Sequence, residues 1–385
     1  MRLVFLPAPL LPLALALTAS PVQAQEQLLP PEVLQSAQRL GITLPQSVPA
    51  NWAAFPRPAA APPAAGAMAP WPTVDWTEST PEAQNMTRAL MVQGGRYAAQ
   101  NGARGLAVFR NGYLVGEWYG RGWTRDTKQK TYSVAKSFTS GLYGMMLQDG
   151  TIPDLAMKVS TEVPSWGDAN HADADLEDLL TMSSGIHWSA FEDYVGLSLA
   201  INQNSYSVGQ PLDYTPGSTW NYSNMGVQVL GKFLKQRRNQ QPHEYAAQEL
   251  FPTIGMWNAD WITDLSGNTL TYQSVRSNVR ELGKFGYLFL RNGEWDGQQL
   301  IPASYVAQAS TPSQALNPFY GLLFWLNTAA LDMPDVPADA YYAAGLFEKR
   351  VYVVPSLDLV VVRLGDGDGD WDDNAFLGPI CQACN

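Results

Sequence analysis

Cysteine and histidine are scarce in this sequence, whose 385 residues include two cysteines and three histidines. The histidines His171, His187 and His243 show neither His-Glu-x-x-His nor paired-ligand spacing, which disfavours a zinc hydrolase. Cys381 and Cys384 form a Cys-x-x-Cys at the end of the chain. No second pair and no βαβ pattern accompany them, so we expect a small disulfide or free thiols rather than a redox or zinc site. The sequence predicts no metal and no organic cofactor.

Basic residues are also few, with 24 Lys and Arg against 35 Asp and Glu, and the formal net charge is −11. An acidic chain of this kind is a poor partner for nucleic acid or for an anionic membrane. Gly-x-Ser-x-Gly, Walker and dinucleotide-binding glycine patterns are all missing from the sequence. Their absence disfavours an α/β-hydrolase triad and the common nucleotide-binding folds.

Long apolar runs are confined to the N-terminus. Met1-Arg2, the apolar run from Leu3 to Leu17 and the small residues before Ala24 are typical of a secretory signal peptide over residues 1–24. This run is too short for a lasting membrane span, so we expect cleavage after Ala24, a periplasmic or secreted protein and no integral membrane segment.

The rest of the chain divides into an arm and one domain. Residues 25–72 contain a Pro- and Ala-rich stretch, and we interpret them as an arm and linker that either wraps the domain or tethers it. Residues 73–385 form the domain. Residues 106–119 alternate around Asn111-Gly112, which predicts a hairpin, and residues 341–364 return to a strand pattern.

Helical and loop patterns lie between these strands. Strands at both ends of a domain with helices between them predict an α/β (α+β) fold, in which an antiparallel β-sheet is flanked by helices. A mainly helical subdomain is expected as an insertion at about residues 150–290. A binding or catalytic site is expected where this insertion meets the sheet.

The first candidate site is Ser133-Val-Ala-Lys136, at the start of a helical pattern that ends near Leu147. Residues three apart share one helix face, so the two polar side chains are neighbours. A serine hydroxyl needs a base to become a nucleophile, and lysine can be that base where burial makes its neutral form accessible. The helix start adds backbone N–H groups that can stabilise an oxyanion. The spacing alone arises by chance roughly once in a chain of this size, so it needs support from elsewhere.

The second candidate element is Tyr222-Ser-Asn224, which precedes a helical pattern from about Met225 to Leu234. A tyrosine oxygen beside a lysine can accept or relay a proton, and an asparagine amide can bind the lysine or a substrate carbonyl. Taken alone, Tyr222 would be interpreted as a half-buried aromatic residue with a locally satisfied hydroxyl.

Together and in this order, Ser133-x-x-Lys136 and Tyr222-x-Asn224 resemble the first two motifs of the serine β-lactamase and penicillin-binding-protein superfamily. The resemblance is to the branch of class C β-lactamases, related esterases and 6-aminohexanoate-dimer hydrolases. It covers about residues 75–378 and includes three further segments, at residues 179–188, 282–303 and 351–362. It implies a β-lactamase/transpeptidase-like fold and an acyl-enzyme on Ser133. Lys136 and Tyr222 would be the general base and acid, with Asn224 in support.

The third motif departs from the family pattern, which is usually Lys-Thr-Gly or a His-Gly-Gly variant. The corresponding stretch is residues 344–350, where Leu346, Phe347 and Glu348 replace small and basic residues. The usual contact of this motif with a substrate carboxylate is therefore not expected in its family form. Lys349 and Arg350 are possible substitutes, but strand alternation puts them on opposite faces, and the sequence does not choose between them.

The resemblance also implies an oxyanion hole that combines the backbone N–H of Ser133 with one from this third-motif strand. Because a backbone donor survives side-chain changes, we assign the second donor to Lys349, with Glu348 as the alternative. Trp188, Tyr194 and Leu346 are expected to contact substrate.

The sequence therefore predicts a secreted serine hydrolase that cleaves an amide or ester and acts on a small molecule or peptide. A β-lactamase or D,D-peptidase is one alternative, and a catalytically silent binder of peptide or cell-wall fragments is another. The oligomeric state is not predicted.

Overall fold

The computed structural model describes residues 69–120, 122–312, 314–367 and 371–384. The predicted signal peptide and most of the predicted arm lie outside these residues. Trp71, near the end of that arm, packs its ring against Trp295 at 5.2 Å and Tyr287 at 5.6 Å between centroids.

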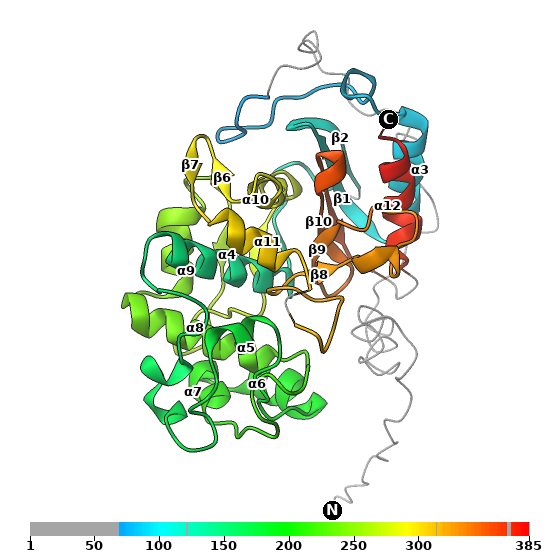
Figure 1. Ribbon diagram of the computed structural model, residues 1–385. Coiled ribbons are helices and arrows are strands. Elements are labelled where there is room, and N and C mark those ends of the chain that lie inside the picture. The colour runs from blue at the N-terminus through cyan, green and yellow to red at the C-terminus, as the bar shows by residue number, and fades with distance from the viewer. Residues whose placement is uncertain (1–68, 121, 313, 368–370, 385) are drawn as a thin grey trace, which may run out of the picture. The chain divides into compact units, whose positions relative to one another are not determined.

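A six-stranded antiparallel sheet has the order β2-β1-β11-β10-β9-β8 (Figure 1). Its strands are β1 Ala103–Arg110, β2 Tyr113–Tyr119, β8 Trp325–Leu326, β9 Tyr341–Gly345, β10 Lys349–Val354 and β11 Leu359–Gly365. β1, the first strand described, pairs with β11, the last, so the middle of the sheet joins segments far apart in sequence. This arrangement confirms the predicted fold class.

The predicted hairpin is β1–β2. Asn111 and Gly112 join these strands with φ of 53° and 79°, the left-handed pair that a tight Asn-Gly hairpin turn requires. The second predicted turn, between β10 and β11, contains the 3₁₀ turn Pro355–Leu357. Every residue of β10 and β11 is buried, because helices cover both faces of the sheet.

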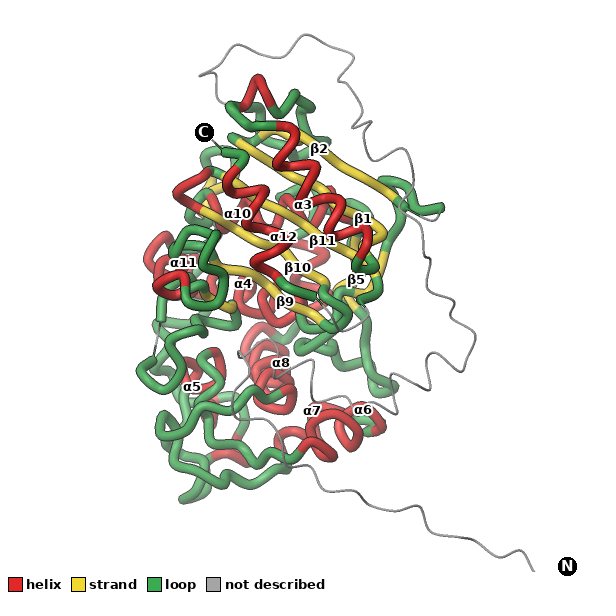
Figure 2. Tube along the Cα trace, turned by 90° about the vertical axis from the view of Figure 1, so that its right-hand side faces the viewer, coloured by secondary structure: helices red, strands yellow, loops and turns green. Residues whose placement is uncertain are grey.

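Helices α3 (Arg88–Gln100) and α12 (Asp373–Gln382) pair on one side of the sheet, and α10 (Val279–Leu290) packs on the other side, as Figures 1 and 2 show. A Cβ on Gly286 of α10 would lie 2.7 Å from Val360, so this glycine allows the helix to approach the sheet closely. The two cysteines are free thiols, one of the two expected states.

The expected helical insertion lies between α4 (Val134–Gln148) and α10. Its helices are α5 Leu176–Leu180, α6 Leu197–Leu199, α7 Gln203–Val208, α8 Asn224–Arg238 and α9 Pro242–Tyr245, with π-helical turns at Phe191–Gly196 and Ala246–Leu250. The expected range of the insertion, to about residue 290, includes α10, which packs on the large sheet.

The remaining elements are short. They are β3 Gln129–Lys130, β4 Asp260–Trp261, β5 Val275–Ser277, β6 Glu294–Trp295, β7 Gln298–Gln299, α11 Ala303–Ala309 and the 3₁₀ turns Glu82–Gln84, Val159–Thr161, Pro164–Trp166 and Thr328–Ala330. β3, β5 and β4 form a small antiparallel sheet.

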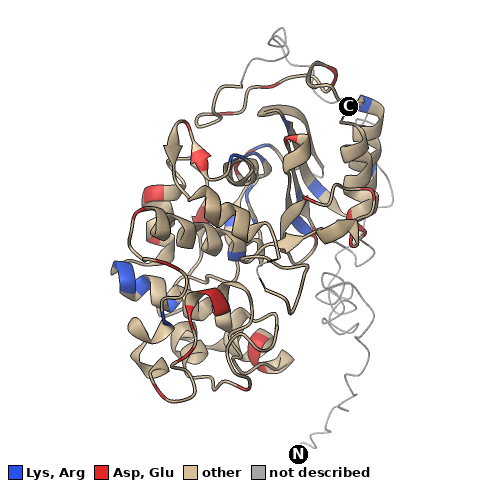
Figure 3. Cartoon of the chain, in the orientation of Figure 1, with Lys and Arg blue, Asp and Glu red and all other residues tan. Residues whose placement is uncertain are grey.

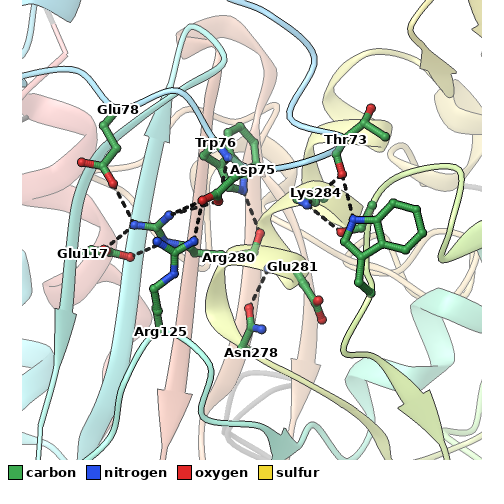
Figure 4. Close-up of polar contacts among 12 residues, drawn as sticks. Thr73, Asp75, Trp76, Glu78, Glu117, Arg125, Asn278, Arg280, Glu281 and Lys284 are labelled. Atoms are coloured by element: carbon green, nitrogen blue, oxygen red, sulfur yellow. Dashed lines mark hydrogen bonds and ion pairs between the residues drawn. The ribbon is translucent and has the colours of Figure 1, made fainter. Parts of the chain in front are cut away.

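A buried arginine ties the first described segment to α10 (Figure 4). The guanidinium of Arg280, 6% exposed, lies 3.0 Å from Asp75, 2.9 Å from Glu78 and 2.6 Å from Glu117. The indole N–H of Trp76 donates to the carbonyl of Arg280 at 2.8 Å. Burial alone would lower the pKa of Arg280, but the hydrogen bonds and charge of Glu117, together with the other carboxylates, raise it above its usual value.

Several other charged side chains are buried as well, among them Lys136, Asp193 and Arg363. In Figure 3 the positions of acidic residues are scattered along the ribbon of the helical insertion, and the last turn of α8 is basic, with Lys235, Arg237 and Arg238. Across the described ranges, no helix is long and apolar enough to cross a bilayer.

Candidate active site

Ser133 directly precedes α4 and is half-buried. The preceding residue, Tyr132, has a left-handed φ of 49°, which is uncommon for an aromatic residue and makes a sharp turn into the helix. Two hydrogen bonds hold this turn: the Ser274 N–H donates to the Tyr132 carbonyl at 3.0 Å, and the Thr131 N–H donates to the Val275 carbonyl at 3.0 Å. The helix start is therefore fixed against the segment that leads into β5.

Lys136 enters the core because α4 is apolar around it. Val134, Ala135 and Phe138 are fully buried, and Lys136 is 1% exposed. Its Nζ lies 2.9 Å from the Ser133 Oγ. The spacing of three residues thus brings amine and hydroxyl into hydrogen-bonding contact.

Two further oxygens surround the Lys136 amine. Nζ donates to the side-chain Oδ1 of Asn224 at 2.7 Å and to the carbonyl of Tyr272 at 3.0 Å. With Ser133 these make three acceptors, the number that an ammonium group can satisfy. A neutral amine would keep two of these contacts and turn its lone pair toward the Ser133 hydroxyl.

Burial lowers the pKa of Lys136 from 10.5 to about 7, and the negative charge of Asp193 opposes this shift. The neutral amine is therefore accessible near neutral pH. A buried lysine with this pKa can both accept a proton and return it.

Tyr222 lies directly before the N-cap of α8, where the Ser223 hydroxyl accepts the Gly226 N–H at 3.0 Å. The Lys136 Nζ is 4.7 Å from the centroid of the Tyr222 ring. That ring stacks on Trp325 with centroids 5.7 Å apart. The structure thus brings Ser133, Lys136, Tyr222 and Asn224 together.

The three expected substrate contacts are half-buried but differ in what surrounds them. Tyr194 lies in the π-helical turn Phe191–Gly196; burial raises its pKa, and the nearby charges of Tyr222 and Asp193 raise it further. The indole N–H of Trp188 is buried and has no hydrogen-bond partner in the described part of the chain. Leu346 follows β9 in the turn that leads to β10.

The third-motif turn places Gly345, at the end of β9, beside the start of α4. A Cβ on Gly345 would lie 2.1 Å from the Thr131 carbonyl and 3.2 Å from the backbone N of Val134. Lys349 belongs to the next strand, β10, where it lies opposite Gly345 in the antiparallel pair. Its ammonium lies 5.2 Å from the Tyr132 ring centroid and donates to the Gly365 carbonyl. The structure therefore favours the Gly345 end of β9 over Lys349 as the backbone neighbour of Ser133.

Arg363 holds this turn in shape. Phe347 and Glu348 both have left-handed φ, 61° and 54°, although neither is glycine. The buried guanidinium of Arg363 donates to their carbonyls at 2.7 Å and 2.8 Å. Arg350 is buried against Asp373 at 3.0 Å. Each of these basic side chains is thus committed to a contact within the protein.

The sequence did not single out two groups that the structure brings to the lysine. Asp193 is completely buried and binds the first residues of α8, and Tyr272 offers its carbonyl. Asp193 is one of 35 acidic residues and has no recognisable motif spacing, and a carbonyl carries no side-chain signal. Within the described ranges, no group of three or more His, Cys, Asp or Glu residues could hold a metal ion.

The sequence profile of the Beta-lactamase family matches residues 83–376. The chain belongs to this family, a result that confirms the resemblance seen in the sequence. A curated relative, an uncharacterized protein of Alkalihalophilus pseudofirmus, is 22% identical over 197 residues, which cover 44% of this chain and 58% of that relative.

Solved structures share the fold. A Bacillus anthracis protein provisionally assigned as a 6-aminohexanoate-dimer hydrolase has a TM-score of 0.63 at 19% identity, covering 75% of this chain and 79% of that one. EstCE1, described as a hydrolase with promiscuous acyltransferase activity, has a TM-score of 0.64 at 16% identity, covering 77% and 97%. A penicillin-binding-protein homologue from Caulobacter crescentus has a TM-score of 0.61 at 11% identity, covering 80% and 98%. The family and these neighbours support a serine hydrolase in general.

Proposed function

We propose that this protein is a secreted serine hydrolase that cleaves an amide or an ester through an acyl-enzyme on Ser133. The contact of 2.9 Å between the Lys136 Nζ and the Ser133 Oγ, inside a pocket that lowers the lysine pKa to about 7, is the observation that carries the proposal. A nucleophile within hydrogen-bonding distance of an accessible base is the arrangement that acyl transfer requires.

In the acylation step, the Ser133 oxygen attacks the substrate carbonyl carbon, and its proton moves to the Lys136 amine directly or through Tyr222. The carbonyl π electrons move to oxygen and form an oxyanion. The backbone N–H of Ser133 and one at the Gly345–Leu346 end of β9 are the proposed donors to this oxyanion. The bond to the leaving alcohol or amine then breaks, and that group takes the proton from Lys136 or Tyr222.

Deacylation uses the same proton-transfer groups, with water as the nucleophile. Lys136 or Tyr222 removes a proton from water, the hydroxide oxygen attacks the ester carbonyl, and the Ser133 oxygen leaves with a proton from the same pair. Asn224 keeps the lysine in place through its contact of 2.7 Å. Trp188, Tyr194 and Leu346 remain the proposed contacts with substrate.

The third-motif turn favours a linear amide or small ester over a β-lactam. The turn carries Leu346 and Phe347 in place of the basic residue that family members use to bind a substrate carboxylate. Lys349 and Arg350 are buried and engaged in internal contacts. The predicted signal peptide supports export to the periplasm or medium, and a small molecule or peptide is the proposed substrate.

A fluorophosphonate probe tests this proposal, because it labels serines that a base has activated. We expect covalent labelling of the wild-type protein and none of Ser133→Ala. Ser137→Ala is the matched control, since this serine lies on the same helix and donates to the Leu323 carbonyl at 2.7 Å. Labelling that persists in Ser133→Ala would overturn the proposal.

A substrate panel separates the alternatives. Turnover of short nitrophenyl esters or linear amides above that of nitrocefin and D-Ala-D-Ala peptides supports the proposed class. The reverse order supports a β-lactamase or D,D-peptidase. If every serine-directed probe fails to label the protein, it is a silent binder of peptide or cell-wall fragments.

A further inference from the structure

Asp193 is a buried carboxylate that the proposed mechanism does not use. It lies in the π-helical turn Phe191–Gly196 and has no exposed surface. Its two carboxylate oxygens accept the backbone N–H groups of Asn224 at 3.0 Å and Met225 at 2.9 Å, and the Ser223 hydroxyl donates to it at 3.3 Å. Because both oxygens accept backbone N–H groups, the ionised form satisfies every contact, whereas a protonated carboxyl would turn a hydroxyl toward one of these donors.

Asn224 connects this carboxylate to the lysine. Its backbone N–H donates to the Asp193 side chain, its side-chain nitrogen donates to the Asp193 carbonyl at 3.4 Å, and its Oδ1 accepts from the Lys136 Nζ at 2.7 Å. A displacement of Asp193 would therefore move the amide that holds the amine. Asp193 also places a negative charge in the same water-excluded region as the lysine.

We infer that Asp193 is a positioning residue for the Ser133–Lys136 pair, which fixes Asn224 against the amine and keeps the amine protonated to higher pH than burial alone would allow. The inference rests on the proposed function of Ser133 and Lys136. Without this carboxylate the lysine would remain a base, but a weaker one that Asn224 holds less firmly in place.

The ionisable groups near Asp193 include Glu192, which is more exposed, and tyrosines that stay neutral at neutral pH. Burial raises the pKa of Tyr194 and Tyr206, and it raises the pKa of Tyr272 to about 12. Burial also raises the pKa of Asp193 itself, while its backbone hydrogen bonds and Lys136 lower it. Lys136 is therefore the group whose titration a change at Asp193 should move.

The test is the pH dependence of ester hydrolysis, kcat/KM, in Asp193→Asn. An asparagine keeps the size of the side chain and removes the charge. We expect the acid limb of the profile to move to lower pH by about one unit, since an opposite charge at short range shifts a pKa by about one to three units. We also expect kcat to fall about tenfold because Asn224 loses one partner.

Two control variants separate this role from a structural one. Ser223→Ala removes the N-cap hydroxyl of α8 and should lower the melting temperature by a few degrees without moving the acid limb. Glu192→Gln removes a more exposed charge from the same turn and should also leave the limb in place.

If Asp193→Asn is folded, as judged by its thermal melt, and its acid limb does not move, the inference is overturned. Asp193 would then act only as a cap of helix α8. If Asp193→Asn does not fold, Asp193→Ser keeps a small acceptor for one backbone N–H and is measured in the same way. Failure of the proposed function would look different, because Ser133→Ala would then retain full activity.

Discussion

Lys136 and Arg280 are both buried cations, but they meet opposite electrostatic surroundings. Arg280 is paired with three carboxylates, and its pKa is raised above the usual value. Lys136 contacts neutral oxygens, and burial lowers its pKa to about 7 although Asp193 opposes the shift. Pairing with carboxylates keeps Arg280 permanently charged and gives it a structural role. The charge of Lys136 is only partly compensated, so its proton is available for transfer.

The largest expected effect is the loss of activity in Lys136→Met. Methionine fills a similar volume but has no amine, so the rate of ester hydrolysis should fall by at least about 10³-fold. Stability should be kept or increased, because no buried amine then needs compensation. Steady-state kinetics and a thermal melt measure both. Activity within about tenfold of wild type would show that another group is the base.

Arg280→Met tests the other half of the comparison. It leaves Glu117, only 12% exposed, beside Asp75 and Glu78 without their shared cation. The free energy of unfolding should fall by about 3 kcal/mol, while the folded enzyme keeps its kcat. Denaturant melts measure the change. Arg276→Met is the control, since its exposed pair with Asp260 should cost less than about 1 kcal/mol.

Tyr222→Phe should reduce kcat by about 10²-fold, the usual contribution of one proton-transfer group. The ring would keep its stacking on Trp325, so the melting temperature should not change. A fall in the melting temperature together with the fall in kcat would instead indicate that the tyrosine hydroxyl has a packing role.

Lys349→Met should have only a small effect on activity. Burial lowers the pKa of this lysine to about 7 as well, and its amine lies near the ring of Tyr132, so it is a rival source of a titration near neutral pH. Its amine donates to the Gly365 carbonyl rather than to Ser133, and we expect kcat/KM within a few-fold of wild type and an unchanged acid limb. If the acid limb disappears in this variant, the base is Lys349 and not Lys136.

The sequence could predict the elements that local patterns encode. Asn111-Gly112 predicted the β1–β2 hairpin, and the apolar pattern after Ser133 predicted α4. The resemblance of two short motifs was enough to expect Ser133, Lys136, Tyr222 and Asn224 in one place, because the family arranges these motifs around one site.

What the sequence could not predict depends on pairing between distant segments. The assignment of an oxyanion donor to Lys349 depended on the register of β9 against β10, which the sequence does not encode; in the structure Gly345 lies against Thr131 and Val134 at the start of α4. The π-helical turn that buries Asp193 against α8 has no sequence period of its own. The sequence pattern of α10 does not say whether this helix belongs to the insertion or to the sheet layer, because an apolar face is what a helix in either region would show.

The most direct test of the account is the pH dependence of Ser133 phosphonylation by a fluorophosphonate, measured as the second-order rate constant in wild type and Lys136→Met. Because the proposed base is the neutral amine of Lys136, the wild-type rate should rise with pH through about 7 and then level off. In Lys136→Met this rise should vanish along with most of the rate. A wild-type rate that rises only near the ordinary pKa of lysine, or a rise that survives in Lys136→Met, would contradict the account.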